Sequence, residues 1–488
     1  MKFCKESMKI GGNCAVETYQ KVRGERGFLF ESKDISHIYG RLSLIGVDPV
    51  LEIRGKGDSF EILPLNKRAA GFMEELSDED MSNFDEFERD DDGIRGKIIK
   101  GYEQFEEGER SKQKNISQVI RLFLEKFKVE GREFVGLYGA FSYDFVKLFE
   151  NIPNLLPEDD VYDFRLMIYD TFIFFDHLKE IKEVIAYRES AEEALEVCEE
   201  LKEKVESEVI SDVEFAVEDD KFDLEQAEFE KLVENARDLA VRGELFEVVY
   251  SNRLRAKFKG DTFALYKKYA DINPSPYLYY FNFGDEQLIG ASPEMMVRCE
   301  HGEVHMRPIS GTARRGEDPI EDHENMLTLL RSEKERAELD MLIDLGRNDL
   351  ARICEPGIEI SDYRFVEKYS KVMHTVAHLT GKLRKEFTAF DSLIACLNAG
   401  TLTGAPKVAA MTEIEKNEKS RRGYYGGTIG YLTFNGDMDT GIIIRTAHIK
   451  GNDMSFQVGA TLLYDSKPEA EYQETLNKAR AFLTTIAS

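Results

Sequence analysis

Short apolar runs separated by turn residues occupy the first 65 residues of the chain. The run 27–30 (Gly-Phe-Leu-Phe) is one example. Apolar runs of this length bounded by turns predict β-strands. Similar runs recur at 134–141 and 172–175, and an apolar stripe with helical spacing starts at Ile116, just after the potential N-cap residue Asn115. The N-terminal region is therefore predicted to combine strands with a core-facing helix.

The segment from Met73 to about Gly108 breaks this pattern. It is acidic and poor in apolar residues, and it includes the run 90–92 (Asp-Asp-Asp). Because such a segment can bury little apolar surface, it is predicted to be a mobile excursion. A second acidic stretch at 214–220 follows a charged helical segment. We expect the chain to divide there, into an N-terminal region of residues 1–215 and a catalytic region of residues 216–488.

The C-terminal region alternates strands with longer helices. The apolar spacing predicts helices near 226–243, 321–345, 388–398 and 468–487, and strands at 245–250, 277–281, 428–434 and 441–448. Groups of two to four strands between helices favour an α+β fold with large mixed or antiparallel sheets and surrounding helices over a doubly wound sheet.

Composition and charge exclude several classes of protein. Of 488 residues, 42% are hydrophobic, with 36 Gly and only 12 Pro, which is the composition of a globular protein. The net charge of −28 repels nucleic acid and anionic membranes. No apolar run approaches the roughly 20 residues that span a bilayer. The 6 cysteines lack C-x-x-C spacing, which favours reduced thiols. We therefore expect a cytoplasmic protein without nucleic-acid or membrane partners.

Two predicted helices carry paired carboxylates at the same spacing. Glu335 and Glu338 lie three residues apart on the helix near 321–345. Glu471 and Glu474 repeat the spacing on the last helix, where Lys478 shares their face. If the two pairs converge, their oxygens suit Mg²⁺, a hard cation that takes oxygen ligands. The spacing alone leaves a second interpretation open, in which both pairs are solvated surface pairs.

Two glycine-dense segments and one histidine complete the candidate chemistry. Segments 399–407 and 421–427 allow backbone N–H groups to approach an anion, although such patterns also mark packing turns. Neither segment has the glycine spacing of a P-loop. His374 follows two apolar residues, and taken alone it is interpreted as structural.

Taken together, a set of motifs resembles the chorismate-utilising enzymes, and among them the large subunit of anthranilate synthase. The resemblance spans roughly Gly243 to the C-terminus, and motifs at 29–32, 41–46 and 139–144 extend it into the N-terminal third. The main motifs are 290–294 (Gly-Ala-Ser-Pro-Glu), 308–312 (Pro-Ile-Ser-Gly-Thr), 344–350 (Asp-Leu-Gly-Arg-Asn-Asp-Leu), 372–374 (Val-Met-His), 401–407 and 471–478.

The resemblance implies a two-domain α/β sandwich of two large sheets that binds chorismate and Mg²⁺. It assigns Mg²⁺ to Glu335, Glu338, Glu471 and Glu474. It implies that Glu294 is the acid for the departing ring hydroxyl, that His374 serves elimination of pyruvate, and that Thr401 is the anthranilate-type residue at its position. The implied substrate contacts are Gly311, Thr312, Tyr425, Arg445, Gly459, Ala460, Thr461 and Lys478.

The implied activity is the Mg²⁺-dependent conversion of chorismate and ammonia to anthranilate and pyruvate, a lyase reaction of tryptophan biosynthesis. Aminodeoxychorismate synthases of the type with a lysine nucleophile carry that lysine where this chain has Ser310. Isochorismate and salicylate synthases resemble one another in carrying a lysine base where this chain has Glu247. Glu247 and Thr461 also depart from the usual anthranilate synthase pattern, which has Gln and Gly at these positions. The resemblance does not define how these two residues affect the product.

Ammonia and feedback control imply two further partners. No glutaminase segment follows the last motif, so we expect a separate glutamine amidotransferase subunit to supply ammonia within a hetero-oligomer. The motif 29–32 resembles a tryptophan feedback site, which implies inhibition by tryptophan bound at Glu31, Ser32, Asn273, Pro274, Ser275, Pro276 and Tyr277.

Two other functions stay open at this point. A 2-amino-2-deoxyisochorismate synthase aminates chorismate without releasing pyruvate, and a non-catalytic tryptophan sensor would need only the feedback site. The presence of Glu294, His374 and all of the paired carboxylates favours an enzyme over a sensor.

Overall fold

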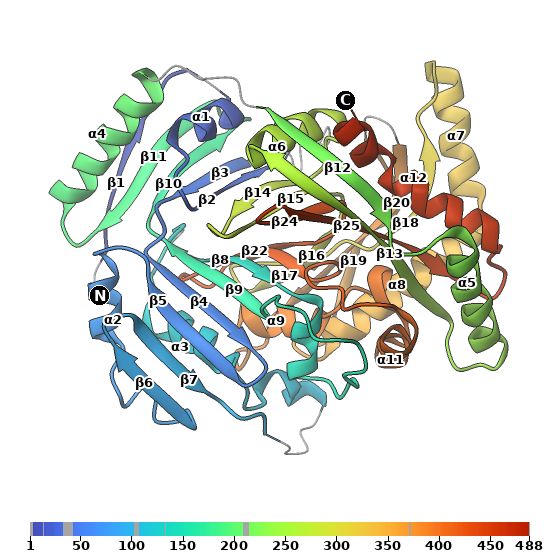
Figure 1. The fold of residues 1–488 in the computed structure, drawn as a ribbon, viewed down its shortest axis with the longest axis horizontal. Coiled ribbons are helices and arrows are strands. Elements are labelled where there is room, and N and C mark those ends of the chain that lie inside the picture. Colours follow the sequence, from blue (N-terminus) through green and yellow to red (C-terminus); the bar gives the residue numbers. More distant parts are fainter. Residues whose placement is uncertain are drawn as a thin grey trace.

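The computed structural model describes residues 3–12, 14–32, 42–101, 107–131, 133–207, 214–369 and 372–487. Within these residues the chain forms two large β-sheets with helices around them (Figure 1). Every strand pairing in both sheets is antiparallel. The predicted α+β class with large sheets is confirmed.

The first sheet takes its strands from both halves of the chain. From one edge to the other it contains β1 (Cys4–Lys9), β11 (Ile181–Arg188), β10 (Thr171–Asp176), β3 (Leu42–Val47), β2 (Gly27–Glu31), β14 (Tyr277–Asn282), β15 (Glu286–Ser292), β24 (Thr446–Lys450), β25 (Asp453–Leu462), β13 (Glu247–Gly260) and β12 (Phe215–Phe222), with β21 (Gly404–Ala405) paired to β13.

The second sheet is also shared between the two halves. Its order is β18 (Ile309–Arg314), β20 (Val372–Lys382), β17 (Glu303–Met306), β16 (Met295–Glu300), β23 (Met438–Ile442), β22 (Thr428–Thr433), β8 (Gly136–Phe141), β9 (Phe164–Tyr169), β4 (Leu51–Lys56), β5 (Ser59–Pro64), β7 (Gly93–Lys97) and β6 (Glu86–Asp90), with β19 (Glu359–Lys368) paired to β20. Both sheets thus contain strands from either side of residue 215, and the division expected there stays a prediction.

The two sheets pack against each other through a shared apolar core. Phe28 of β2 stacks on Tyr138 of β8 with ring centroids 4.8 Å apart, and the same core includes Phe281 of β14 and Leu166 of β9. Aromatic pairs of this kind add to the area buried between the layers. The core therefore fixes the position of one sheet on the other.

Helices cover the outer face of the first sheet. Leu254, Ala256 and Phe258 alternate along β13 and join the core beneath these helices, whereas Arg253 and Arg255 lie on the opposite face of the strand. In Figure 1, α4 lies against β1 and β11, and α12 packs against α5 and β25. These helices are α1 (Ala15–Val22), α4 (Ala191–Ser207), α5 (Gln226–Val241), α6 (Thr262–Ile272) and α12 (Pro468–Ala487).

The other helices are associated with the second sheet and the connections between sheets. They are α2 (Ala69–Glu75), α3 (Gln118–Lys126), α7 (Pro319–Arg331), α8 (Glu333–Ala351), α9 (Ala389–Cys396), α10 (Gly400–Thr403) and α11 (Lys407–Asn417), with 3₁₀ segments η1 (Glu107–Lys112) and η2 (Tyr143–Leu148). The described helices include none with the length and apolar content that a bilayer crossing requires.

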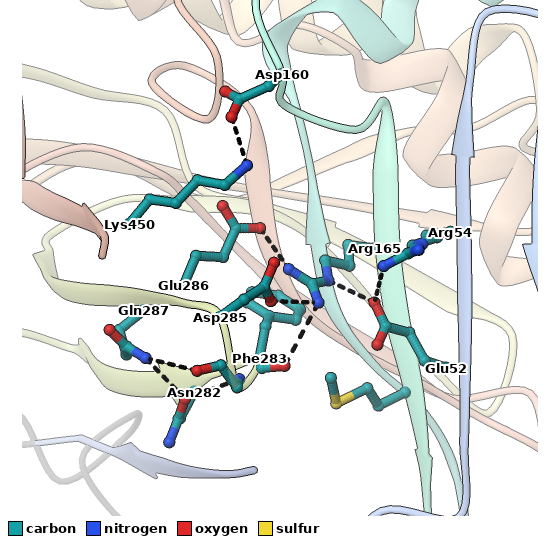
Figure 2. Close-up of polar contacts among 12 residues, drawn as sticks. Glu52, Arg54, Asp160, Arg165, Asn282, Phe283, Asp285, Glu286, Gln287 and Lys450 are labelled. Atoms are coloured by element: carbon teal, nitrogen blue, oxygen red, sulfur yellow. Dashed lines mark hydrogen bonds and ion pairs between the residues drawn. The ribbon is translucent and has the colours of Figure 1, made fainter. Parts of the chain in front are cut away.

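A buried polar network joins the two sheets around Arg165 (Figure 2). Arg165 of β9 donates to Glu52 of its own sheet (2.5 Å) and to Glu286 of β15 in the other sheet (2.9 Å). Tyr424 and His448 also contact Glu286, at 2.8 and 2.7 Å. Burial opposes ionisation of Glu286, but His448 and Arg165 outweigh it and lower its pKa to about 2. Because each buried charge has partners, the network avoids the cost of an unpaired ion.

The expectation of a mobile excursion after Met73 is wrong for the residues that the structure describes there. Strands β6 and β7 form an antiparallel hairpin at the edge of the second sheet. The few apolar side chains of this segment, Leu76, Met81, Ile94 and Ile98, are fully buried. An edge hairpin needs to bury only one face, so sparse apolar residues suffice. Residues 102–106 lie outside the described residues.

The helix predicted near 321–345 is two helices, α7 and α8. The backbone of Ser332 is extended, and its hydroxyl accepts a hydrogen bond from the N–H of Glu335. Ser332 is therefore the N-cap of α8, a position that serine favours because its oxygen satisfies a free N–H group. The break fixes where Glu335 and Glu338 lie in the first turns of α8.

Candidate active site

Glu294 and Thr401 come together from distant parts of the chain. Glu294 lies in the turn between β15 and β16, and Thr401 lies in the short helix α10. The hydroxyl of Thr401 donates to Oε2 of Glu294 at 2.8 Å. Burial raises the pKa of Glu294, while this hydrogen bond and the charges of Lys478 and Arg445 act in the opposite direction. A buried carboxyl with a raised pKa suits a general acid.

His374 on β20 has one ring nitrogen fixed by the neighbouring strand β18. Its Nδ1 lies 2.9 Å from the carbonyl oxygen of Gly311 and 3.1 Å from Oγ1 of Thr312. Because a carbonyl can only accept, the contact assigns the proton to Nδ1 and leaves Nε2 as the basic nitrogen. Burial lowers the pKa of His374. The arrangement suits a neutral imidazole acting as a base.

The carboxylate pairs of α8 and α12 face the same region. Burial raises the pKa of Glu338, and the negative charges of Glu335 and, from the other helix, Glu474 raise it further. Burial likewise raises the pKa of Glu471, with Glu474 adding to the effect. The charges of two helices interact in this way only where their carboxylates are close. The structure therefore places Glu338 of α8 and Glu474 of α12 close enough for their charges to interact.

The donor chemistry of this acidic group fits Mg²⁺. Its members are carboxylates, the oxygen ligands that Mg²⁺ prefers, and their mutual repulsion favours a bound cation. Among the described residues, no three Asp, Glu, His or Cys side chains are already gathered around one point as a finished metal site. Magnesium commonly keeps several waters and binds only one or two carboxylates directly, so the group can serve without such a cage.

Lys478 connects the acidic group to β25. Its ammonium lies 2.8 Å from Oε1 of Glu474 and donates to the carbonyl of Gly459 at 2.9 Å. A Cβ atom at Gly459 would lie 2.7 Å from the hydroxyl oxygen of Tyr425, so a side chain at that position would displace the tyrosine. Glycine is thus required there for close approach of Tyr425 to the strand.

Arg445 occupies a strained turn between β23 and β24. Its φ is 51°, in the left-handed region that residues other than glycine rarely adopt. The turn is held by its carbonyl, which accepts from the backbone of Ala291 and the hydroxyl of Tyr269, each at 3.1 Å. The charge of Arg445 acts on both Glu294 and His374. The turn therefore places a guanidinium near both candidate catalytic groups.

The remaining predicted substrate contacts divide between the faces of their strands. The side chain of Ala460 is buried in the core under α5, while its neighbours Gly459 and Thr461 point to the other face, as alternation along β25 requires. Only the backbone of Ala460 is therefore available to a ligand.

Gly311 of β18 lies against the first turn of α8. Its φ is 71°, and a Cβ atom there would lie 2.7 Å from Oε2 of Glu335. A side chain at this position would therefore displace the Glu335 carboxylate.

Sequence reasoning missed the role of Arg422. Its guanidinium donates to the backbone carbonyls of Leu402 (2.5 Å) and Val249 (2.6 Å) and pairs with Glu418 at 2.7 Å. It also lies over the ring of Tyr425, 5.5 Å from the centroid. Arg422 thus supports both the Thr401 helix and Tyr425. The only sequence signal was its place beside the glycine-dense segment 421–427.

The predicted inhibitor residues only partly share one cavity. A cavity of about 620 Å³ is lined by Glu31, Ser32, Pro276 and Tyr277 together with apolar side chains of both sheets. The hydroxyl of Ser32 is buried and has no hydrogen-bond partner among the described residues. Ser275 instead bonds to the carbonyl of Ala291 at 3.2 Å. Asn273, Pro274 and Ser275 are not among the lining residues and form the connection from α6 to β14.

Comparison with known proteins identifies the family. A model of the chorismate binding enzyme family matches residues 68–484. Component 1 of anthranilate synthase from Aquifex aeolicus is 39% identical over 365 residues, covering 72% of this chain and 74% of the relative. The same component from Pseudomonas aeruginosa is 40% identical over 368 residues, covering 72% and 75%. The chain therefore belongs to the chorismate binding enzymes.

Within that family, both of these relatives are component 1 of anthranilate synthase, as the sequence predicted. The crystal structure of anthranilate synthase component I from Streptococcus pneumoniae has a TM-score of 0.74 to this chain, at 31% identity and 95% coverage of both chains. The menaquinone-specific isochorismate synthase from Escherichia coli has a TM-score of 0.70 at 15% identity, covering 99% of this chain and 95% of that one. The second likeness shows the fold alone.

Proposed function

We propose that this chain acts as component I of anthranilate synthase, which converts chorismate and ammonia to anthranilate and pyruvate. The assignment of the active site rests on the contacts of Lys478. Its ammonium pairs with Glu474 and donates to the carbonyl of Gly459, and its charge acts on Glu294. These contacts connect the acidic group, the substrate-binding strand and the candidate acid. A chorismate-binding enzyme with all of these parts is equipped for amination.

The first step adds nitrogen and removes the ring hydroxyl. The nitrogen lone pair forms a C–N bond at the ring carbon beside the carboxylate-bearing carbon, the two ring double bonds shift, and the C–O bond to the hydroxyl breaks. Glu294 gives its proton to that oxygen, which leaves as water, and recovers a proton from solvent. The added nitrogen remains as an ammonium group. The raised pKa of Glu294 keeps the required proton available.

The second step makes the ring aromatic. Nε2 of His374 removes the proton from the carbon that bears nitrogen, those electrons form the last ring double bond, and the C–O bond to the enolpyruvyl group breaks. Pyruvate leaves as its enolate, which takes the proton back from the protonated His374 at its methylene carbon, and the ring ammonium releases a proton to solvent to become the amino group of anthranilate. Retention of a basic Nε2, fixed through Nδ1 and Gly311, supports anthranilate rather than 2-amino-2-deoxyisochorismate as the final product.

Charge complementarity defines the substrate positions in this proposal. Glu335, Glu338, Glu471 and Glu474 would hold Mg²⁺, which when bound neutralises the ring carboxylate of chorismate. The guanidinium of Arg445 and the hydroxyl of Tyr425 would receive the enolpyruvyl carboxylate, which suits the planar donors of arginine. In a chain of net charge −28, such local cations are needed to hold a dianionic substrate.

The name component 1 of the relatives implies a second component. For this chain we propose a separate glutamine amidotransferase subunit that delivers ammonia. The test compares the purified chain with ammonium and with glutamine as the only nitrogen source. Anthranilate formation from ammonium and none from glutamine is expected, and efficient use of glutamine by the single chain would contradict the separate partner.

Tryptophan is proposed to inhibit from the cavity that Glu31 and Ser32 line. The cavity joins apolar side chains to acidic and hydroxyl groups, a combination that fits an aromatic amino acid. The hydroxyl of Ser32, which has no hydrogen-bond partner among the described residues, supplies a hydrogen-bonding group for the ligand. Because a ligand shifts an equilibrium only through its differential affinity, bound tryptophan must favour a form of the enzyme that binds chorismate less well.

A further inference from the structure

A second large cavity lies on the inner face of the first sheet, on the side of the strands that the helices do not cover. Its volume is about 690 Å³, and its walls come from β13, β24 and β25 together with the segment that holds Tyr424 and Tyr425. Neither Glu294 nor His374 lines it. Pockets of about 300–1,000 Å³ commonly hold small molecules, so the cavity has room for a ligand.

The arginine and lysine side chains that line this cavity nearly all have a carboxylate partner. The pairs are Arg255 with Asp223, Lys257 with Asp453, Arg422 with Glu418, and Lys450 with Asp160, the last of which is drawn in Figure 2. Arg253 is the exception, because no carboxylate of the described residues lies within ion-pair distance of it. The cavity therefore contains one positive charge that the described part of the chain does not pair.

Neutral oxygens hold the guanidinium of Arg253. Its Nε and Nη2 donate to Oε1 of Gln457 at 3.0 and 2.9 Å, and Nη2 also donates to the carbonyl of Arg421. Nη1 makes no hydrogen bond to any residue that the structure describes. Arginine stays protonated in proteins, and its planar donors match the two oxygens of a carboxylate. Arg253 is therefore fixed in place and keeps a donor for an anion.

Tyr425 connects this cavity to the proposed substrate position. Its side chain lines the cavity, and its hydroxyl lies close to Gly459 of β25. Ser251 lies opposite Gly459 in the pairing of β13 with β25. Arg253, two residues further along β13, lies opposite Gln457. Alternate residues of a strand share a face and lie about 7 Å apart, so Arg253 follows directly after the substrate position on the same face.

We propose that this cavity is a second carboxylate site, in which Arg253 binds the carboxylate of a small organic acid. Leu288, Ile443 and Met454 also line the cavity, and these apolar side chains suit the carbon part of such a ligand better than an inorganic anion. Pyruvate and anthranilate are the two organic acids that the proposed reaction would release beside the cavity. The choice of these two ligands rests on the proposed function, whereas the site itself rests on the geometry around Arg253.

Calorimetric titration of the chain without Mg²⁺ tests the site, with pyruvate, anthranilate and sodium phosphate added in separate experiments. At least one of the two organic acids is expected to bind the parent chain. Arg253→Gln should weaken that binding about tenfold, which corresponds to about 1.4 kcal/mol of lost hydrogen bonding to a charged group. Arg255→Gln is the matched control, because Arg255 is exposed and already paired with Asp223. It should bind within about twofold of the parent.

A second variant tests the cavity without removing the hydrogen bonds of Arg253. Ser455 of β25 lines the same cavity, and Ser455→Phe would fill part of it with an aromatic ring. This variant should also lose binding of the organic acid. Thermal unfolding checks that each variant folds, and the result for Ser455→Phe decides if Arg253→Gln does not fold.

Three results separate this site from its alternatives. The proposal is overturned if neither organic acid binds the parent chain, or if folded Arg253→Gln binds the acid as tightly as the parent does. Phosphate binding that depends on Arg253, without binding of either organic acid, assigns the cavity to inorganic anions and also overturns it. A parent chain that binds an organic acid through Arg253 but forms no anthranilate from chorismate and ammonium rejects the proposed function and leaves this site in place.

Discussion

The hydroxyl of Thr401 donates a 2.8 Å hydrogen bond to Oε2 of Glu294, although 107 positions separate the two residues in the chain. The bond stabilises the ionised form of the carboxyl, while burial, the larger effect, stabilises the neutral form. The pKa of Glu294 therefore results from two opposed contributions, one of which a single substitution can remove.

Thr401→Val should move the alkaline limb of the kcat profile to higher pH. Removing the hydroxyl takes away a bond that favours ionised Glu294, so its pKa rises and the protonated acid persists to higher pH. A hydrogen bond to a charged group of about 1.5 kcal/mol corresponds to a shift of about one pH unit. Thr401→Ser, which keeps the donor, is the control. Coincident alkaline limbs for the valine and serine variants would show that the bond does not tune Glu294.

Glu335→Gln and Glu474→Gln should each weaken Mg²⁺ binding. Either change removes one negative charge from the acidic group of α8 and α12, and losing a ligand or its support typically costs about 10–100-fold in metal affinity. Calorimetric titration with MgCl₂, alongside turnover at limiting Mg²⁺, measures the effect. Glu333→Gln, an exposed residue of the same helix, is the matched control. Parental Mg²⁺ affinity in both the Glu335 and the Glu474 variant would make the pairs ordinary helix-surface charges.

His374→Met should separate amination from elimination. The variant lacks the basic Nε2 and is expected to accumulate the aminated ring compound that still carries its enolpyruvyl group, while Glu294→Gln forms neither product. In the parent enzyme, burial lowers the pKa of His374, so elimination should fail only as the pH drops through that lowered pKa. Liquid chromatography with mass spectrometry follows both compounds. Anthranilate release by His374→Met at the parental rate would exclude this role.

Ser32→Arg should relieve inhibition by tryptophan. The long charged side chain would occupy part of the cavity of about 620 Å³ and replace the hydroxyl of Ser32 that lines it. Uninhibited turnover should remain near the parental rate because Ser32 lies outside the proposed catalytic group. By thermodynamic reciprocity, chorismate should also weaken tryptophan binding to the parent chain. Equal tryptophan affinity with and without chorismate, or unchanged inhibition of the variant, would reject regulation from this cavity.

The local pattern of apolar and polar residues predicted the helices well, but it failed where the structure of a segment depends on pairing with another segment. The last helix begins at Pro468 as expected, because capping and apolar spacing are encoded within the segment itself. The edge hairpin β6–β7 was missed because β7 pairs with strand β5, which lies outside the acidic segment. The composition of that segment suggested mobility and gave no sign of this pairing. Pairing partners of strands cannot be read from the strands alone.

The candidate site shows the same limit at the level of single side chains. The spacing of Glu335 and Glu338 indicated a shared face, but only the structure shows that the charge of Glu474 on another helix acts on Glu338. The left-handed backbone of Arg445 and the burial of Glu247, whose Oε2 has no hydrogen-bond partner among the described residues, depend on how turns and strands pack. Neither feature has a local sequence signal, because arginine and glutamate occur widely on exposed surfaces.

Product analysis of the purified chain tests the central claim most directly. The chain is incubated with chorismate, ammonium chloride and Mg²⁺, and products are identified by anthranilate fluorescence and mass spectrometry, with pyruvate measured in parallel. The account predicts anthranilate and pyruvate in equal amounts, with loss of both when Mg²⁺ is chelated. An aminated ring compound without pyruvate, isochorismate, or unchanged chorismate under these conditions would contradict it.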